Sequence, residues 1–154
     1  MIYLRDAGVR FDRQGDSMVV TRPGMLAPLD LSTGTYPGIN SDMQPLLVAL
    51  ATQADGTSRI TDIRFADRFQ YVEHLCRLGA RIRVSGNVVE VDGPTPLHGA
   101  PVTATDLRGG AALTVAASVA EGTTTLAGFE EVERGYESFT EKLEGLGLKV
   151  DCVE

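Results

Sequence analysis

The chain has 154 residues, of which 43% are apolar and 23% charged, and its formal net charge is −7 at pH 7. This length and composition are typical of one globular domain with a hydrophobic core, and an acidic chain without a basic block is not expected to bind nucleic acid, because neutralising phosphates needs a basic face. No run of about eighteen apolar residues occurs, so we also expect no membrane-spanning helix.

The N-terminal segment predicts the end of a helix followed by a β-hairpin. Residues 6–20 read DAGVRFDRQGDSMVV, in which a glycine ends a helix and two alternating runs flank Gly15 and Asp16. The chain thus begins inside a helix whose first turns are missing, and we expect it to be a piece of a longer protein. An alternative start or a short N-terminal helix is the other interpretation.

A helix opened by Asp42 is the next predicted element. Its apolar residues recur with helical spacing and form one face, at Met43, Leu46, Leu47 and Leu50. Gly56 and Thr57 then introduce a short strand.

A second helix and a second hairpin follow. Arg68 opens the helix, and Asp67 and Gln70 have the spacing of a capping box. Residues 78–91 read LGARIRVSGNVVEV, which repeats the N-terminal pattern of a helix-ending glycine and two alternating runs. The Gly-Asn dipeptide at 86–87 predicts the turn between them.

The same order of elements recurs in the last third of the chain. Asp106 opens a helix that Thr105 is predicted to cap, and residues 111–120 are apolar nearly all round, which indicates a buried helix. Arg134 opens a last helix, and residues 146–153 read LGLKVDCV, which predicts a final strand.

These elements form a repeat of strand, helix, strand, helix and strand–turn–strand. We assign residues 1–34 to the tail of an earlier unit, 35–100 to a complete unit and 101–154 to the last unit. The fold class expected from this order is α/β.

Several charged residues near helix starts are candidates for a site. Asp42 and Asp106 are either caps or groups that handle a proton, and Arg108 lies close to Asp106. Arg68 and Arg134 oppose the helix dipole, so each either pairs with an acid or binds a ligand. The acidic neighbours available are Asp62 and Asp67 for Arg68, and Glu130, Glu131 and Glu133 for Arg134.

Other residue types give no sign of a cofactor or metal site. His74 and His98 lack metal-ligand spacing, and the glycines at 109–110 lack the spacing of a phosphate loop, so we interpret them as small residues that allow close helix packing. Cys76 and Cys152 are too few for a disulfide framework, which favours a reducing cytoplasm. Cys76 lies on an apolar helix face and is predicted to be buried and inert.

Four segments taken together resemble one enzyme family. They are YPGINSDMQ (36–44), RFADRF (64–69), ATDLRGGAAL (104–113) and ERGYE (133–137). Their order and spacing resemble the UDP-N-acetylglucosamine 1-carboxyvinyltransferases more than the related enolpyruvyl transferase of the shikimate pathway. The resemblance covers essentially the whole chain and corresponds to about the last third of such an enzyme.

The resemblance implies an inside-out α/β barrel fold of two domains, each built from three βαβαββ units, of which this chain would form part of one. It also implies transfer of enolpyruvate from phosphoenolpyruvate to the 3-hydroxyl of UDP-N-acetylglucosamine, an early step of peptidoglycan synthesis, without a bound cofactor. The domain that carries the family's cysteine loop is absent. We therefore expect the chain alone to be inactive and to need that N-terminal domain in cis or in trans.

The resemblance also implies roles for particular residues. Asp42 matches the aspartate that contacts the sugar 3-hydroxyl as its base, and the backbone at Arg64 matches a contact to the UDP-sugar. Arg134 matches the arginine that binds phosphoenolpyruvate or phosphate. Asp106 and Arg108 match a pair that lines the same cleft, with Asp106 placed to handle a proton at the enolpyruvyl methylene.

The chain also departs from the family pattern. Ser41 stands where Thr is usual, Arg64 where an apolar residue is usual, Ala66-Asp67 where Glu-Asn is usual, and Gly109-Gly110 where Ala-Ser is usual. Two other interpretations therefore stay open. One is a paralogous transferase with another nucleotide or nucleoside acceptor, and the other is a non-catalytic module that binds a sugar nucleotide or a partner chain.

Overall fold

A computed structural model describes residues 2–22, 24–36, 38–65 and 67–152. Three sequence predictions touch positions outside these ranges: the departure at Ala66, Pro37 of the 36–44 motif, and Val153 of the expected final strand. The helices are α1 (Ile2–Asp6), the 3-10 helix η1 (Ser41–Met43), α2 (Gln44–Ala51), α3 (Gln70–Arg77), α4 (Leu107–Ala117), α5 (Glu130–Glu133) and α6 (Phe139–Gly145). The strands are β1 (Arg10–Gln14), β2 (Ser17–Thr21), β3 (Asp30–Ser32), β4 (Gly56–Thr61), β5 (Arg81–Ser85), β6 (Val88–Gly93), β7 (Pro101–Thr103) and β8 (Thr125–Ala127).

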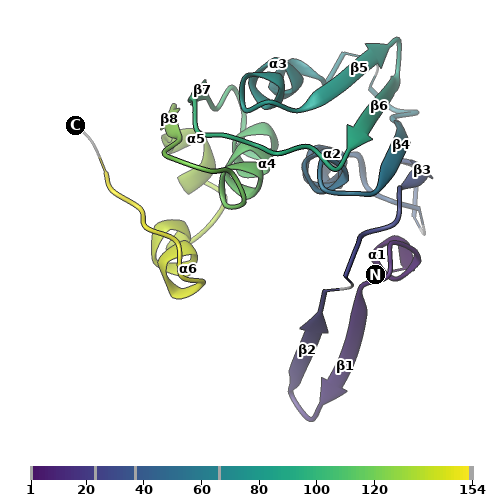
Figure 1. Ribbon diagram of the computed structural model, residues 1–154, viewed down its shortest axis with the longest axis horizontal. Helices are drawn as coiled ribbons and strands as arrows, with labels where there is room; N and C mark the ends of the chain where they lie inside the picture. The colour runs from purple at the N-terminus through teal and green to yellow at the C-terminus, as the bar shows by residue number, and fades with distance from the viewer. Residues whose placement is uncertain (1, 23, 37, 66, 153–154) are drawn as a thin grey trace.

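The N-terminal helix and hairpin extend away from the rest of the molecule (Figure 1). Strands β1 and β2 pair antiparallel, with Arg10 opposite Thr21. Gly15 turns the chain at φ +61°, a conformation that glycine adopts without a steric penalty. The predicted hairpin is confirmed, and its second strand leaves Met18, Val19 and Val20 exposed.

The central sheet has the strand order β3-β4-β6-β5. Strand β3 runs parallel to β4, with helix α2 as the crossover, while β4 and β5 both pair antiparallel with β6. The second predicted hairpin, β5 and β6, is confirmed, with Gly86 at φ +59° in its turn. The order β3, α2, β4, α3, β5, β6 is that of one βαβαββ unit. The unit boundaries at 34 and 100 stay a prediction.

The core lies between this sheet and the helices that cover it. Ile60, Val89 and Val91 from the sheet and Leu75 from α3 are fully buried. Helix α4 packs against α2, α3 and α5, and Gly109 to Leu113 are buried (Figure 1). The prediction that residues 111–120 are buried nearly all round holds only in part, because Val115 and Val119 are exposed. The parallel strands β7 and β8 lie beside α4, on the side away from the central sheet (Figure 1).

Close packing of α4 depends on its two glycines. A Cβ at Gly109 would lie 3.1 Å from the Cβ of Tyr71, and one at Gly110 would lie 2.5 Å from Cγ2 of Val132 and 2.7 Å from Cβ of Ala104. The interpretation of these glycines as packing residues is therefore confirmed.

We expect Gly110→Ala to destabilise the chain by about 1–2 kcal/mol, because the overpacking strain exceeds the roughly 1 kcal/mol that alanine gains in helix propensity. Urea unfolding of the chain measures this change. Gly145→Ala is the matched control, since a Cβ at that helical position meets no atom within 4 Å. Equal stability of the two variants would contradict the packing argument.

Several local predictions are wrong. Residues 148–152 form no strand, because no described segment pairs with them. Cys76 is exposed, although desolvation still raises the pKa of its thiol. The start of α3 has no side-chain cap, because its N-cap is Phe69, and the Gln70 amide donates instead to the Asp67 carbonyl at 2.8 Å.

The described helices are too short or too polar for any of them to cross a bilayer.

Candidate functional site

Asp42 lies in a tight turn immediately before α2. Asn40 caps this turn, because its side-chain oxygen accepts a hydrogen bond from the Asp42 N–H at 3.1 Å. Pro45 follows in the first turn of α2, where a proline is tolerated because its missing N–H would have no helical partner. The Asp42 side chain is about 43% exposed and does not itself line the pocket described below, although two of its contacts do.

Two arginines from distant segments contact the Asp42 carboxylate. The Arg108 Nε lies 2.8 Å from Asp42 Oδ1, and the Arg68 Nη1 lies 3.3 Å from the same oxygen. Among the described residues, no hydrogen bond or ion pair involves Oδ2 of Asp42. One carboxylate oxygen is therefore held by two cations, and the other can face a ligand.

Asp106 places Arg108. Its Oδ1 accepts the N–H groups of Arg108 at 2.9 Å and Gly109 at 3.0 Å, so Asp106 is the N-cap of α4. The prediction that Thr105 caps this helix is wrong, because the Asp106 backbone is extended at the cap position and brings its own carboxylate over the first turn. Removal of this cap would release the start of the helix that carries Arg108.

The partner of Arg68 differs from the one expected. The sequence offers Asp62 and Asp67 as neighbours, but the guanidinium pairs with Asp42, which comes from the turn before α2. Its Cζ also lies 4.1 Å from the centroid of the Phe65 ring, a cation–π contact that holds the guanidinium in place.

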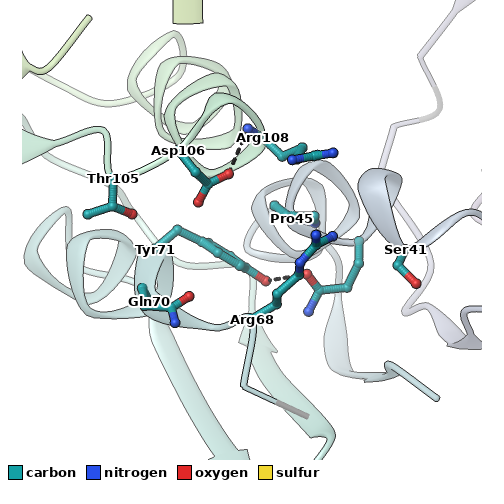
Figure 2. A pocket seen from close by; sticks show the side chains of 9 residues that line it. Ser41, Pro45, Arg68, Gln70, Tyr71, Thr105, Asp106 and Arg108 are labelled. Carbon is teal, nitrogen blue, oxygen red and sulfur yellow. Dashed lines mark hydrogen bonds between the residues drawn. The ribbon is translucent and has the colours of Figure 1, made fainter. Parts of the chain in front are cut away.

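A pocket of about 400 Å³ lies beside these groups, lined by Ser41, Gln44, Pro45, Arg68, Gln70, Tyr71, Thr105, Asp106 and Arg108. Figure 2 shows Arg108 entering it from the start of α4 and Arg68 from the segment before α3. Arg68 and Arg108 bring two cations to the pocket, and the carboxylates of Asp106 in the lining and of Asp42 beside it offset their charge. The guanidinium groups remain donors for an acceptor or anionic group of a ligand.

A buried tyrosine, Tyr71, forms part of the pocket lining. The Tyr71 hydroxyl donates to Oε1 of Gln44 at 3.0 Å, and burial raises the pKa of Tyr71 far above its ordinary value, so the hydroxyl stays protonated. The Gln44 Nε2 is buried and has no hydrogen-bond partner among the described residues. An unsatisfied donor beside a pocket is suited to an acceptor atom of a ligand or of water.

Arg64 lies at a second, smaller pocket. This pocket measures about 290 Å³ and is lined by Gly34, Thr35, Tyr36, Gly38, Asn40 and Arg64. The Arg64 side chain is exposed, and its backbone N–H donates to Asp62 Oδ1 at 3.0 Å.

Arg134 does not line the larger pocket. It is the C-cap of α5 and does not open a helix, and it pairs with Glu131 at 2.8 Å, one of the acids that the sequence offered. Its side chain is 62% exposed. The structure joins Asp42 to Arg108 and, through the cap, to Asp106. Of the predicted site residues, Asp106 and Arg108 line the larger pocket, whereas Asp42, Arg64 and Arg134 do not.

Sequence reasoning left Gln44 and Tyr71 out of the site and did not decide the role of Arg68. The signal for Gln44 was its place at the end of the SDMQ sequence, directly after Asp42. Tyr71 gave no signal, because its spacing on α3 is that of a core residue. The described residues hold no cluster of three His, Cys, Asp or Glu side chains that is placed to bind a metal ion.

Comparison with known proteins decides the family. Residues 1–143 match the family EPSP synthase (3-phosphoshikimate 1-carboxyvinyltransferase). The chain belongs to this family. The expected α/β fold of enolpyruvyl transferases, present here as a partial domain, is thereby confirmed.

Within the family, several relatives are similar over nearly the whole chain. A UDP-N-acetylglucosamine 1-carboxyvinyltransferase of Acidobacterium capsulatum is 45% identical over 96% of this chain and 34% of its own length. The enolpyruvyl transferase NikO from Streptomyces tendae is 36% identical, with a TM-score of 0.86 over 95% of this chain and 34% of that one. EPSP synthase from Acinetobacter baumannii shares the fold at a TM-score of 0.69 and 18% identity, covering 99% of this chain and 36% of that one. The chain therefore spans about a third of these relatives.

Proposed function

We propose that the chain is one part of an enolpyruvyl transferase that moves enolpyruvate from phosphoenolpyruvate to the 3-hydroxyl of UDP-N-acetylglucosamine. The 45% identity to an enzyme of that name supports the acceptor. The observation that carries the proposal is the Asp42 carboxylate, held by Arg68 and Arg108, two residues that line the adjacent pocket. The chain does not complete the reaction alone, because the other two thirds of such an enzyme close the site.

Asp42 takes the proton of the acceptor hydroxyl in this proposal. Both arginines contact Oδ1, so Oδ2 can accept a hydrogen bond from the hydroxyl and then its proton as the oxygen attacks C2 of phosphoenolpyruvate and the C3 methylene gains a proton. Loss of a proton from C3 and of phosphate from C2 then restores the double bond of the transferred enolpyruvyl group. The arginines keep the carboxylate in one orientation, which reduces the entropic cost of reaching the reactive geometry. Their charge also favours the anionic groups of both substrates.

Asp106 contributes in two ways. Its Oδ1 caps α4 and so fixes Arg108, and its carboxyl group lines the same pocket. In this proposal that carboxyl group handles a proton at the enolpyruvyl methylene, and Arg134, which is exposed and paired with Glu131, exchanges this partner for a phosphate when the other domain is present.

A second candidate acceptor is a different nucleotide or nucleoside. The observation that favours it is the exposed Arg64 side chain beside Tyr36, which is 97% exposed at the smaller pocket. A cation and an aromatic ring there would bind an anionic or planar group that an apolar residue at position 64 would not.

Titration of the ¹⁵N-labelled chain with UDP-N-acetylglucosamine tests the acceptor. We expect saturable shifts of the amide signals of Asp42, Arg64 and Arg108, because these residues carry the predicted sugar contacts. Uridine, titrated separately, distinguishes a nucleoside acceptor from a sugar nucleotide. Amide signals that stay in place with both ligands at millimolar concentration would contradict binding by the chain alone.

Arg108→Gln is the informative variant in this titration. It keeps hydrogen-bonding capacity but removes the charge, and we expect affinity for UDP-N-acetylglucosamine to fall by roughly 10-fold, the worth of a hydrogen bond to a charged group. Arg83→Gln is the matched control, since Arg83 pairs with Asp92 on the exposed face of the sheet. Equal affinity of the two variants would exclude Arg108 from the binding site.

A further inference from the structure

Asp62 is a buried carboxylate that the proposed reaction does not use. It follows the end of β4 and is 1% exposed. Its Oδ1 lies within hydrogen-bond distance of four donors: Thr33 Oγ1 at 2.9 Å, Ser41 Oγ at 3.2 Å, Arg64 N at 3.0 Å and Phe65 N at 3.2 Å. In the described part of the chain no ion pair reaches it, and its Oδ2 is buried without a hydrogen-bond partner.

A buried acidic group of this kind is costly for the fold. Burial of a carboxylate without a countercharge is unfavourable unless several donors compensate for the lost water, and one of its two oxygens here has no donor. An apolar side chain at the end of β4 would have packed without that cost. The carboxylate does what an apolar side chain cannot do: one of its oxygens accepts hydrogen bonds from three separate chain segments. These segments are the residues after β3, the turn before α2 and the residues after β4.

Two of the donors to Asp62 belong to segments that also carry or support residues of the proposed site. Ser41, one donor to Asp62, directly precedes Asp42 in the η1 turn. Phe65, another donor, supports the Arg68 guanidinium at 4.1 Å. The ion pair between Arg68 and Asp42 links these two segments to each other. The contacts therefore form a ring that runs through Asp62, Ser41, Asp42, Arg68 and Phe65.

We propose that Asp62 is a positioning residue that sets the distance between the Asp42 carboxylate and the Arg68 guanidinium. It acts through Ser41 on one side and through Phe65 on the other, and it touches no substrate itself. The inference rests on the proposed function only for its effect on ligand binding. The placement of Arg68 over Phe65 follows from Asp62 whatever the ligand is.

Loss of the carboxylate releases both sides together. Two backbone N–H groups and two hydroxyls lose their common acceptor, so the segment 62–65 and the η1 turn move independently. A displacement of about 1 Å at a binding group is enough to weaken its interaction strongly. Asp62→Asn keeps one oxygen but removes the charge that the four donors stabilise and puts an amide donor at the buried position of Oδ2, so it also loosens the ring of contacts.

The first test uses NMR of the 154-residue chain without ligand. Stacking on Phe65 shifts the Arg68 side-chain signals upfield, and Phe65→Ala gives their unstacked positions. We expect Asp62→Asn and Asp62→Ala to move these signals toward the unstacked positions while the amide signals of Ile60 and Val89 in the sheet stay in place. Asp92→Asn, an exposed aspartate on β6 that also accepts from a threonine and an arginine, is the matched control.

Arg68 signals that stay in place in a folded Asp62→Asn chain would overturn the proposal. If Asp62→Ala does not fold, Asp62→Asn alone decides the question.

The second test is a double-mutant cycle on the affinity for UDP-N-acetylglucosamine. We expect Asp62→Asn and Phe65→Ala each to weaken binding by roughly 10-fold, and the double variant to weaken it no further, because both act through Arg68. If the losses of affinity in the two single variants multiply in the double variant, Asp62 does not act through Arg68 and its role is structural only. If the unmodified chain does not bind, the proposed function fails for the chain alone, and the Arg68 signals still decide the role of Asp62.

Discussion

Replacement of Asp42 by asparagine is expected to lower kcat by about 10²–10⁴-fold in an enzyme that joins this chain to the first two thirds of the Acidobacterium capsulatum relative. Asparagine has nearly the same shape and can still accept the hydrogen bond from Arg68, whose Nη1 lies 3.3 Å from Asp42 Oδ1, while it loses the charge that pairs with Arg108. It cannot take a proton from the acceptor hydroxyl. The loss should therefore fall on kcat, with a much smaller change in KM for UDP-N-acetylglucosamine.

Release of phosphate from phosphoenolpyruvate in the presence of the acceptor measures this effect. The unmodified fusion must be active first, which itself tests whether this chain supplies a working third of the enzyme. Asp92→Asn is the control, because Asp92 pairs with Arg83 on the exposed face of the sheet. A fusion in which Asp42→Asn lowers kcat by less than about 10-fold would show that another group takes the proton.

Leu75→Ala is expected to destabilise the chain by about 2–5 kcal/mol. Leu75 is fully buried on α3, in the layer between the sheet and α4, so its loss leaves a cavity that neighbouring helices and strands cannot fill. A loss of this size is a large share of the stability of a domain of this length, about 5–15 kcal/mol. The variant should also loosen the site, because α3 continues from the segment that carries Arg68.

The midpoint of urea unfolding, followed by circular dichroism, measures the change at an unchanged slope. Leu146→Ala removes the same atoms from a residue that is 81% exposed and should alter stability by less than about 0.5 kcal/mol. Similar midpoints for the two variants would mean that the region around α3 is not a packed core.

Local features of the fold could be predicted because short-range chemistry decides them. Both hairpins follow from alternating residues around a glycine turn, at Gly15 and at Gly86, where positive φ angles require that residue type. The apolar run of α4 indicated its burial, and Asp106 was identified as a group at its start. The order and spacing of the four motifs also indicated the family, since together they cover nearly all of the chain.

The tertiary structure alone decided which of these groups meet. Arg68 had two acidic neighbours in sequence, yet it pairs with Asp42 because the η1 turn and the segment before α3 lie at the same edge of the molecule. Asp62 turned out to be buried for the same reason, since it collects donors from three segments. Cys76 is exposed although its helical spacing indicated burial.

The physical reason for this division is the range of the interactions. Turns, caps and periodicity depend on residues within a few positions of one another, so a single sequence displays them. Pairing of charges, burial of a carboxylate and formation of a strand depend on partners far along the chain, and their geometry exists only after the helices have packed on the sheet. Residues 148–152 show this most simply, since they have the alternation of a strand but, in the described structure, no neighbour with which to pair.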